Sequence, residues 1–191
     1  MQATELNNLS VEEYLNIEQE SNSKYEYHNG HIYAMAGGTI NHGLICGNIF
    51  GEIRAKLKEK DSDCKAINSE IKLHIEKLNK YIYLDTMVIC GDIKTSDDLP
   101  NAVTNPILIV EVLSKSTADY DRGDKFFFYQ KIASLQEYIL IEQDKKQIDI
   151  YTRKKNLWKI SRITSINKIL QISSLNIKIN LNDIYQDTDF N

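Results

Sequence analysis

The sequence contains little cysteine, and its cysteines are not spaced as a disulfide framework. Cys46, Cys64 and Cys90 are the three cysteines among 191 residues, and no two of them form a C-x-x-C pair. Because secreted scaffolds carry paired cysteines in even numbers, this pattern argues against an extracellular disulfide-bonded protein. We expect free thiols, buried as small apolar side chains in a reduced cytoplasmic protein.

The sequence also lacks a membrane-spanning segment and a secretory leader. No run of about 18 residues is free of charged and polar side chains, as a transmembrane helix would require. The first ten residues are polar and do not show the basic and then apolar layout of a signal peptide. These absences predict no membrane association and agree with a cytoplasmic location.

Positive charge is not in excess either. The chain has 23 lysines and arginines against 27 aspartates and glutamates, a net charge of −4, which excludes attraction to nucleic acid over the whole surface. Contact with a polyanion would therefore depend on a local patch. An apolar content of 42% and a charged content of 26% are ordinary for a folded protein, and the length predicts a single domain over residues 1–191.

Short motifs and hydrophobic periodicity predict a mixture of helices and strands. Ser10 and Glu13 form a capping box that opens a first helix, and Asn29-Gly30 predicts a hairpin turn between two aromatic-rich runs. Helical spacing predicts further helices over about 41–60, 119–133 and 181–186. Strand-like runs cover 64–68, 70–75, 81–90, 107–113, 138–142, 147–152, 157–163 and 169–172, the last four as an antiparallel meander. This mixture predicts an α+β fold.

One face of the second predicted helix carries only glycine. Gly43, Gly47 and Gly51 are four residues apart, and each costs about 1 kcal/mol of helix propensity relative to alanine. Asn48 and Glu52 argue against a membrane-dimer motif on this helix. We therefore expect the glycine face to pack closely against another element.

Two acidic residues interrupt strands that are otherwise apolar. Asp85 lies within the run 81–90, and Glu111 is the one acid of the run 107–113. Continuous apolar runs of this kind are typical of central strands covered on both faces, where a carboxylate is costly unless it is paired or bound to a metal. Two such carboxylates that converge at one sheet edge would favour Mg²⁺ or Mn²⁺. The alternative for each acid is a structural ion pair with lysine or arginine, or an end in solvent.

Catalysis at a phosphate or carbonyl would also need a nearby cation. Lys115 follows the second acidic strand, and Arg122 and Lys125 lie at the start of the next predicted helix. Lys125 shares its side of that helix with apolar residues three, four and seven positions later, so it is expected to face the sheet. The alternative is a lysine whose stem packs on the core while its amino group reaches water.

At these residues the sequence resembles the restriction-endonuclease-like family of the PD-(D/E)XK nuclease superfamily. The resemblance runs from about Ser10 to Arg153. Its specific elements are the Glu-Val-x-Ser run at Glu111 and the Asp-Arg-Gly-x-Lys-Phe run that contains Lys125. The resemblance implies a restriction-endonuclease-like core, a mixed central sheet flanked by helices, with an N-terminal hairpin and C-terminal antiparallel strands.

The resemblance also assigns roles to particular residues. Asp85 and Glu111 stand where the superfamily's metal-binding acids fall, the Val112 backbone carbonyl is a third oxygen, and Glu26 is an additional acid near the metal. Leu113 occupies the usual position of the motif lysine, so the cationic role is expected to pass to Lys125.

Two further positions depart from the family pattern. Leu84 replaces the proline that usually precedes the aspartate, which should alter the strand locally. Lys115 replaces a loop proline and could compete with Lys125 for the cationic role.

The activity implied is Mg²⁺-dependent hydrolysis of DNA phosphodiester bonds, with Mn²⁺ as a substitute. Lys125 would orient or deprotonate the attacking water or offset phosphate charge, and His42 would assist the metal's ligands, contact phosphate or cap its helix. Lys115 and Arg122 would add to a local DNA-binding patch, and a homodimer is possible. The alternative is a catalytically silent nuclease fold that binds DNA or protein. Zinc and nucleotide chemistry are not expected, because H-E-x-x-H, C-x-x-C, P-loop and dinucleotide motifs are missing.

Overall fold

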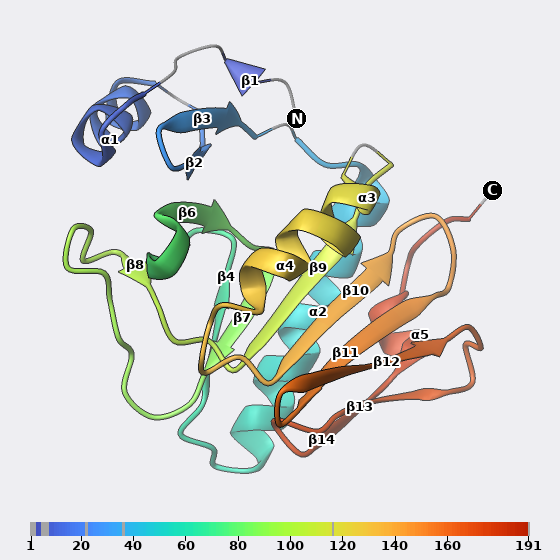
Figure 1. Ribbon diagram of the computed structural model, residues 1–191. Coiled ribbons are helices and arrows are strands. Elements are labelled where there is room, and N and C mark those ends of the chain that lie inside the picture. Colours follow the sequence, from blue (N-terminus) through green and yellow to red (C-terminus); the bar gives the residue numbers. More distant parts are fainter. Residues whose placement is uncertain (1–2, 5–7, 22, 36, 116, 191) are drawn as a thin grey trace.

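Two mixed β-sheets organise the part of the chain that the computed structural model describes, residues 3–4, 8–21, 23–35, 37–115 and 117–190 (Figure 1). The first sheet has the order β1 (Ala3–Thr4), β3 (His31–Ala34), β2 (Tyr25–His28), β6 (Lys80–Tyr83), β5 (Lys72–Ile75), β8 (Ala102–Val103). The second has the order β12 (Leu157–Ile163), β11 (Ile148–Lys154), β10 (Glu137–Glu142), β9 (Leu108–Leu113), β7 (Thr86–Ile89), β4 (Lys65–Asn68). Each sheet contains one parallel pair, β5 with β8 and β9 with β10, among antiparallel pairs.

The N-terminal elements form as the local motifs predict. Helix α1 (Val11–Glu20) begins at Ser10, whose side chain accepts the backbone N–H of Glu13 in a complete capping box. The hairpin of β2 and β3 turns at Asn29 and Gly30, whose φ angles of 47° and 99° fit the left-handed turn that Asn-Gly favours. Both predictions are confirmed.

Helix α2 (Ile40–Glu59) covers one face of the second sheet with a stripe of buried aliphatic residues. Its glycine face does not pack as expected. Gly43, Gly47 and Gly51 are exposed, and no described atom outside the helix lies within 4 Å of a Cβ placed on any of them. The expectation of close packing is wrong, because the helix packs through its aliphatic stripe and is also held by hydrogen bonds from Asn48 to the backbone carbonyls of Ile184 and Gln186.

The second sheet is buried on both faces at β9. Leu108, Val110 and Val112 pack in the cluster that contains α2, while Ile109 and Leu113 pack in the cluster on the opposite face. Since side chains alternate along a strand, the side chain of Glu111 takes the face of Ile109 and Leu113. The prediction of a central strand carrying one acid is confirmed.

The run predicted as one strand over 81–90 is two strands in different sheets. β6 ends at Tyr83 in the first sheet, and β7 begins at Thr86 in the second. The chain crosses between the sheets at Leu84 and Asp85, and Asp85 forms the bend directly before β7. The break therefore places Asp85 where the two sheets meet.

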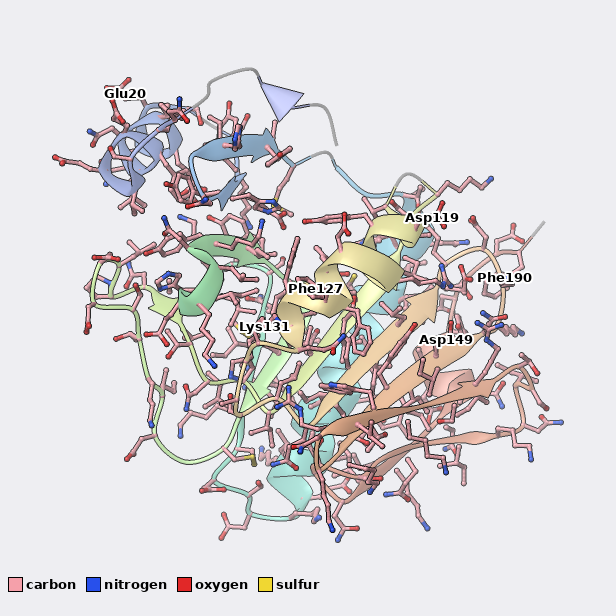
Figure 2. All side chains as sticks on the ribbon, viewed as in Figure 1. Glu20, Asp119, Phe127, Lys131, Asp149 and Phe190 are labelled. Carbon is pink, nitrogen blue, oxygen red and sulfur yellow. A yellow bond between two sulfur atoms is a disulfide. The ribbon has the colours of Figure 1, made fainter. Side chains whose placement is uncertain are left out.

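The helical segment after β9 consists of three short pieces: α3 (Ala118–Tyr120), the π-helical turn η2 (Asp121–Lys125) and α4 (Phe126–Tyr129). It is shorter than the helix predicted to residue 133. Asp119 and Phe127 are exposed on its outer side (Figure 2), whereas Asp121, Lys125 and Tyr129 are buried. π-Helical turns are frequent at functional sites.

The C-terminal strands follow the prediction in part. β10, β11 and β12 form the antiparallel meander, but β13 (Ile169–Ile172) pairs with an unexpected strand, β14 (Ile177–Asn180), in a separate two-stranded sheet. A short helix, α5 (Leu181–Ile184), and a 3₁₀ turn, η1 (Glu76–Leu78), complete the described elements. The fold is mixed α+β, as predicted.

The cysteines differ from their prediction. A disulfide joins Cys64 and Cys90, which the pairing of Lys65 with Ile89 brings opposite each other across β4 and β7. The expectation of free thiols is therefore wrong for this pair and holds for Cys46, which is partly buried. Of the helices that the described ranges contain, none has the length and apolarity to cross a membrane.

Candidate active site

The two acids singled out in the sequence lie side by side, Glu111 on β9 and Asp85 in the bend directly before β7. The pairing of Thr86 with Val110 makes Asp85 and Glu111 the next residues along the two strands. The carboxylate of Asp85 is fixed by the backbone N–H of Val112, which donates to Oδ2 over 2.7 Å. The two acids therefore converge at the end of the central strands, as the sequence predicts.

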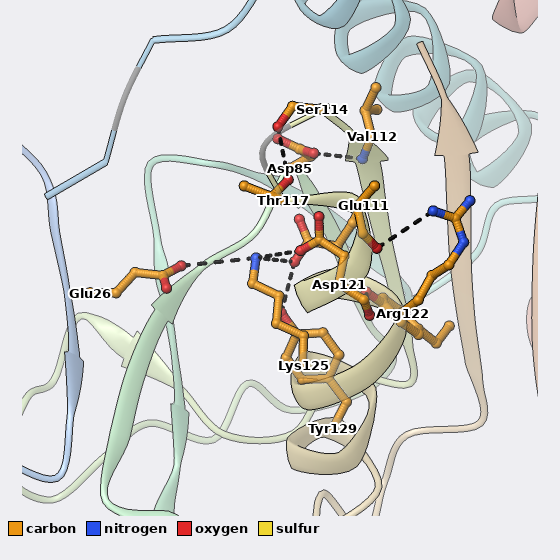
Figure 3. Close-up of polar contacts among 12 residues, drawn as sticks. Glu26, Asp85, Glu111, Val112, Ser114, Thr117, Asp121, Arg122, Lys125 and Tyr129 are labelled. Atoms are coloured by element: carbon orange, nitrogen blue, oxygen red, sulfur yellow. Dashed lines mark hydrogen bonds and ion pairs between the residues drawn. The ribbon is translucent and has the colours of Figure 1, made fainter. Parts of the chain in front are cut away.

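Lys125 brings Glu111 together with two further acids. Its Nζ atom donates to Glu111 Oε1 over 2.9 Å and forms ion pairs with Asp121 Oδ1 at 3.4 Å and Glu26 Oε1 at 4.0 Å (Figure 3). All four side chains are at most 8% exposed. The lysine therefore faces the sheet, as predicted, and its amino group does not reach water.

Burial and charge act in opposite directions on this lysine. Burial alone would lower the pKa of Lys125, but the carboxylates of Glu111, Glu26 and Asp121 outweigh it and raise the pKa well above its usual value. Lys125 is therefore a cation at neutral pH. It can neutralise negative charge or donate a hydrogen bond, but it cannot accept a proton from water.

Glu111 and Asp121 are both harder to ionise than ordinary carboxyl groups. Burial raises the pKa of Glu111 to about 8, with Lys125 opposing the shift and Asp85 and Asp121 adding to it. Burial likewise raises the pKa of Asp121, against the opposing effects of Lys125 and a hydrogen bond from Thr117. Without a further positive charge, the site holds more carboxylate than it can neutralise.

Two residues of the site were missed in the sequence. Tyr129 donates its hydroxyl to Glu111 Oε1 over 2.7 Å, and Asp121 holds Lys125 from the preceding turn. The backbone carbonyl of Asp121 in turn accepts the hydroxyl of Tyr138 over 3.0 Å, which anchors η2 to β10. The signal was available, because positions 121, 125 and 129 are four apart and share one helix face.

Glu26 reaches the site from the hairpin of the first sheet. It is 1% exposed, and its Oε2 lies 3.3 Å from Nε2 of His28. Its Oε1 is buried and accepts no hydrogen bond from the described residues. The site therefore lies between the two sheets, with Asp85 and Glu111 on one and Glu26 on the other.

His42 lies beside the predicted metal ligands. Its Nε2 is 3.6 Å from Asp85 Oδ2, and its backbone N–H donates to the hydroxyl of Thr39, the N-cap residue directly before α2. His42 is thus not the helix cap. Its Nδ1 is 3.5 Å from the Sγ of Cys46, and burial, with Asp85 nearby, raises the pKa of that thiol above its usual value.

The two remaining cationic candidates do not contact the acid cluster, the group formed by Glu26, Glu111 and Asp121 around Lys125. The guanidinium of Arg122 contacts Glu142 Oε1 at 2.7 Å and Asp149 Oδ2 at 3.6 Å, so it serves a structural ion-pair network with β10 and β11. Lys115 is exposed in the turn after β9. Lys125, rather than Lys115, occupies the position beside Glu111.

Known proteins are similar to this chain in sequence or in fold. Residues 11–182 match the model of the Uma2 family, described as "Putative restriction endonuclease". Two uncharacterized proteins of Synechocystis sp. (strain ATCC 27184 / PCC 6803 / Kazusa) are each 34% identical: slr1290 over 95% of this chain and 94% of its own, and sll1609 over 88% and 95%. The crystal structure of "a putative nuclease belonging to DUF820" from Anabaena variabilis ATCC 29413 has a TM-score of 0.75 at 15% identity, covering 93% of this chain and 97% of that one.

Proposed function

The chain belongs to the Uma2 restriction endonuclease family, and from this we propose that it is a metal-dependent endodeoxyribonuclease whose site is built from Asp85, Glu111 and Lys125. Membership of the family confirms the resemblance seen in the sequence. The proposal extends it to a substrate, duplex DNA, and to a reaction, phosphodiester hydrolysis.

This proposal rests on the observation that the buried carboxylates of the site outnumber the cations beside them. Among the described lysines and arginines, Lys125 alone forms ion pairs with Glu111, Asp121 and Glu26, and Asp85 lies beside them. Buried carboxylates are costly unless they are paired or bound to a metal. A site with this excess of negative oxygen is suited to a divalent cation.

The donor set fits Mg²⁺, with Mn²⁺ as a substitute, because hard cations prefer carboxylate and carbonyl oxygens. Asp85 and Glu111 would hold the ion, and the carbonyl of Val112 and the carboxylate of Glu26 are further candidate ligands. Oε1 of Glu26 supports this fit, because it accepts no hydrogen bond from the described residues and a buried carboxylate oxygen rarely lacks a donor. When bound, the ion lowers the pKa of a coordinated water and stabilises negative charge on the phosphate.

The protein's own residues supply the remaining parts of the reaction. Lys125, held cationic by its acids, offsets the charge that develops on the phosphate oxygens. Tyr129 and Asp121 keep Glu111 and Lys125 in place through their hydrogen bond and ion pair. Glu26 Oε1 accepts no hydrogen bond from the described residues, so it can accept one from the attacking water.

Nicking of supercoiled plasmid DNA tests the proposal. We expect the wild-type protein to nick in Mg²⁺ or Mn²⁺ and to stop when the metal is chelated. Asp85→Asn and Glu111→Gln should lower the rate about 10³-fold, equivalent to about 4 kcal/mol of barrier. Lys125→Met should lower it about 10²–10³-fold, as expected for loss of one group that stabilises developing charge.

A matched control is available on the same helical segment. Asp119 is exposed, so Asp119→Asn should nick at the wild-type rate. Circular dichroism must show that every variant keeps the fold. Nicking that survives Glu111→Gln would refute the site. Calorimetric binding of Mn²⁺ without any nicking would favour the alternative, a silent nuclease fold.

A further inference from the structure

A group of three side chains that could bind a metal lies next to the acid cluster, on the side of α2. His42 and Cys46 are one helical turn apart on α2, and Asp85 approaches them from the bend before β7. His42 Nε2 is 3.6 Å from Asp85 Oδ2, and His42 Nδ1 is 3.5 Å from Cys46 Sγ. With one ligand atom taken from each side chain, all three atoms lie within 4.8 Å of one another.

These distances are close to those of a zinc site. Ligand atoms bonded to zinc at about 2.0–2.3 Å lie about 3.3–3.8 Å apart in a tetrahedral arrangement. The thiol of Cys46 also lies close enough to the Asp85 carboxylate for that group to raise its pKa, so each of the three side chains adjoins the other two. Small side-chain rotations then suffice to bring one ring nitrogen, the sulfur and one carboxylate oxygen around a common ion.

Two of the three ligands are already held in place. The carboxylate of Asp85 accepts the backbone N–H of Val112, and the backbone of His42 is fixed by Thr39 at the start of α2. Gly38 lies against the imidazole so closely that an added Cβ would be 2.9 Å from Nδ1. The histidine ring is therefore confined at its Nδ1 edge by the backbone of Gly38.

The chemistry of this set differs from that of the acid cluster. Nitrogen, thiolate and carboxylate together suit Zn²⁺, which binds histidine and cysteine in tetrahedral sites, whereas Mg²⁺ and Mn²⁺ prefer oxygen alone. Cys46 keeps its thiol, because the disulfide involves the other two cysteines. Three protein ligands leave a fourth position for water.

We propose that His42, Cys46 and Asp85 form a binding site for a thiophilic divalent cation, Zn²⁺, which competes with Mg²⁺ for Asp85 and inhibits the nuclease. Binding releases the thiol proton to solvent and forms the metal–sulfur bond. The binding site stands on its own geometry, and the inhibition rests on the proposed function. The sequence shows no zinc motif, because the third ligand, Asp85, lies far from His42 and Cys46 along the chain.

Cobalt is the probe for the binding site, since Co²⁺ replaces Zn²⁺ and gives a charge-transfer absorption band when a thiolate binds it. Titration of the full chain, without a thiol reductant, should produce this band. Cys46→Ser should abolish it, while the Cys64→Ser/Cys90→Ser double variant should retain it. Competition by Zn²⁺ should remove the band at one equivalent.

Further variants separate this site from the acid cluster. His42→Ala and Asp85→Asn should weaken Zn²⁺ binding at least about 10-fold, because even indirect partners of a metal ligand are worth about 10–100-fold in affinity. Glu111→Gln should bind Co²⁺ like the wild type, although it should not nick DNA. No band in the wild type, or a band that survives Cys46→Ser, overturns the proposal.

The inhibition is measured in the nicking assay with Mg²⁺. Zn²⁺ should inhibit the wild type, and Cys46→Ser should nick at the wild-type rate and need at least about 10-fold more Zn²⁺ for the same inhibition. Equal inhibition of both proteins would refute competition at this site. If the wild type never nicks but the cobalt band depends on Cys46, the metal site stands and the proposed nuclease activity fails.

Discussion

The protonation state of Glu111 is subject to opposing effects of burial, neighbouring charges and hydrogen bonds. It is buried within a central strand, yet it accepts hydrogen bonds from both Lys125 and Tyr129. Such donors favour the ionised carboxylate, whereas burial and the neighbouring acids favour the protonated form. The raised pKa of Glu111 shows that, without a metal, burial and like charge prevail.

This conflict predicts how the stability of the metal-free protein depends on pH. The pKa of Glu111 is near its ordinary value of 4.5 when the protein is unfolded and about 8 when it is folded. Between these values the folded state binds more protons than the unfolded state, so the free energy of unfolding falls as the pH rises. Asp121, also raised, acts in the same direction, while Lys125 stays protonated in both states throughout this range.

We therefore expect the free energy of unfolding in EDTA to decrease from pH 5 to pH 8 by a few kcal/mol, on the order of 3. Glu111→Gln should remove most of this decrease. Urea denaturation at several pH values measures it, with the exposed Glu70→Gln as a control that keeps the wild-type slope. A slope unchanged in Glu111→Gln would assign the titration to another group.

At the scale of elements, the sequence identifies those that are locally encoded. The capping box at Ser10, the Asn29-Gly30 turn and the aliphatic stripe of α2 each appear where the sequence predicts them. Each of these elements is predicted from residues that lie close together in the sequence. The same holds for Lys125, whose apolar neighbours on one helix face predict that it is buried.

Elements defined by distant pairing were not predictable in the same way. The apolar run 81–90 gives no local sign of a break, because β6 is separated from β7 by its pairing with β2 and β5 in another sheet. The disulfide likewise depends on the register of β4 and β7. Arg122, three residues before Lys125, pairs with acids of β10 and β11 that only the folded sheet brings near.

The glycines of α2 allow a test at this scale. Gly47 and Gly51 lie inside the helix with open space at their Cβ positions, so alanine adds helix propensity without a clash. We expect Gly47→Ala/Gly51→Ala to raise the free energy of unfolding by about 2 kcal/mol, about 1 kcal/mol for each site. Chemical denaturation measures the change.

Gly38→Ala is the contrasting variant, because its Cβ would displace the ring of His42. It should not stabilise the protein. A loss of stability in the α2 double variant would mean that the glycine face is covered in solution.

At the scale of the whole molecule, the charge of −4 works against a DNA substrate. The structure sharpens this difficulty, since Lys125 is buried among acids and Arg122 is engaged by Glu142 and Asp149. Of the three cationic candidates in the sequence, Lys115, Arg122 and Lys125, two are therefore neutralised within the protein. Only Lys115 of that set remains exposed to meet a phosphate.

A bound divalent cation should then control DNA affinity, because it removes negative charge where the phosphate must approach. We expect duplex DNA to bind at least about 10-fold more tightly in Ca²⁺, a hard cation with the same preference for oxygen, than in EDTA. Glu111→Gln should lose most of this increase, yet bind DNA like the wild type in EDTA at pH 7, since the raised pKa of Glu111 already leaves most of this carboxyl group uncharged in the metal-free protein.

Fluorescence anisotropy at several salt concentrations measures both effects. The dependence of log K on log salt should be shallow for so acidic a protein, and Lys115→Ala should reduce its slope by about 1, the amount expected for one phosphate contact. An affinity indifferent to Ca²⁺, with an unchanged slope in Lys115→Ala, would place the DNA on another face of the molecule.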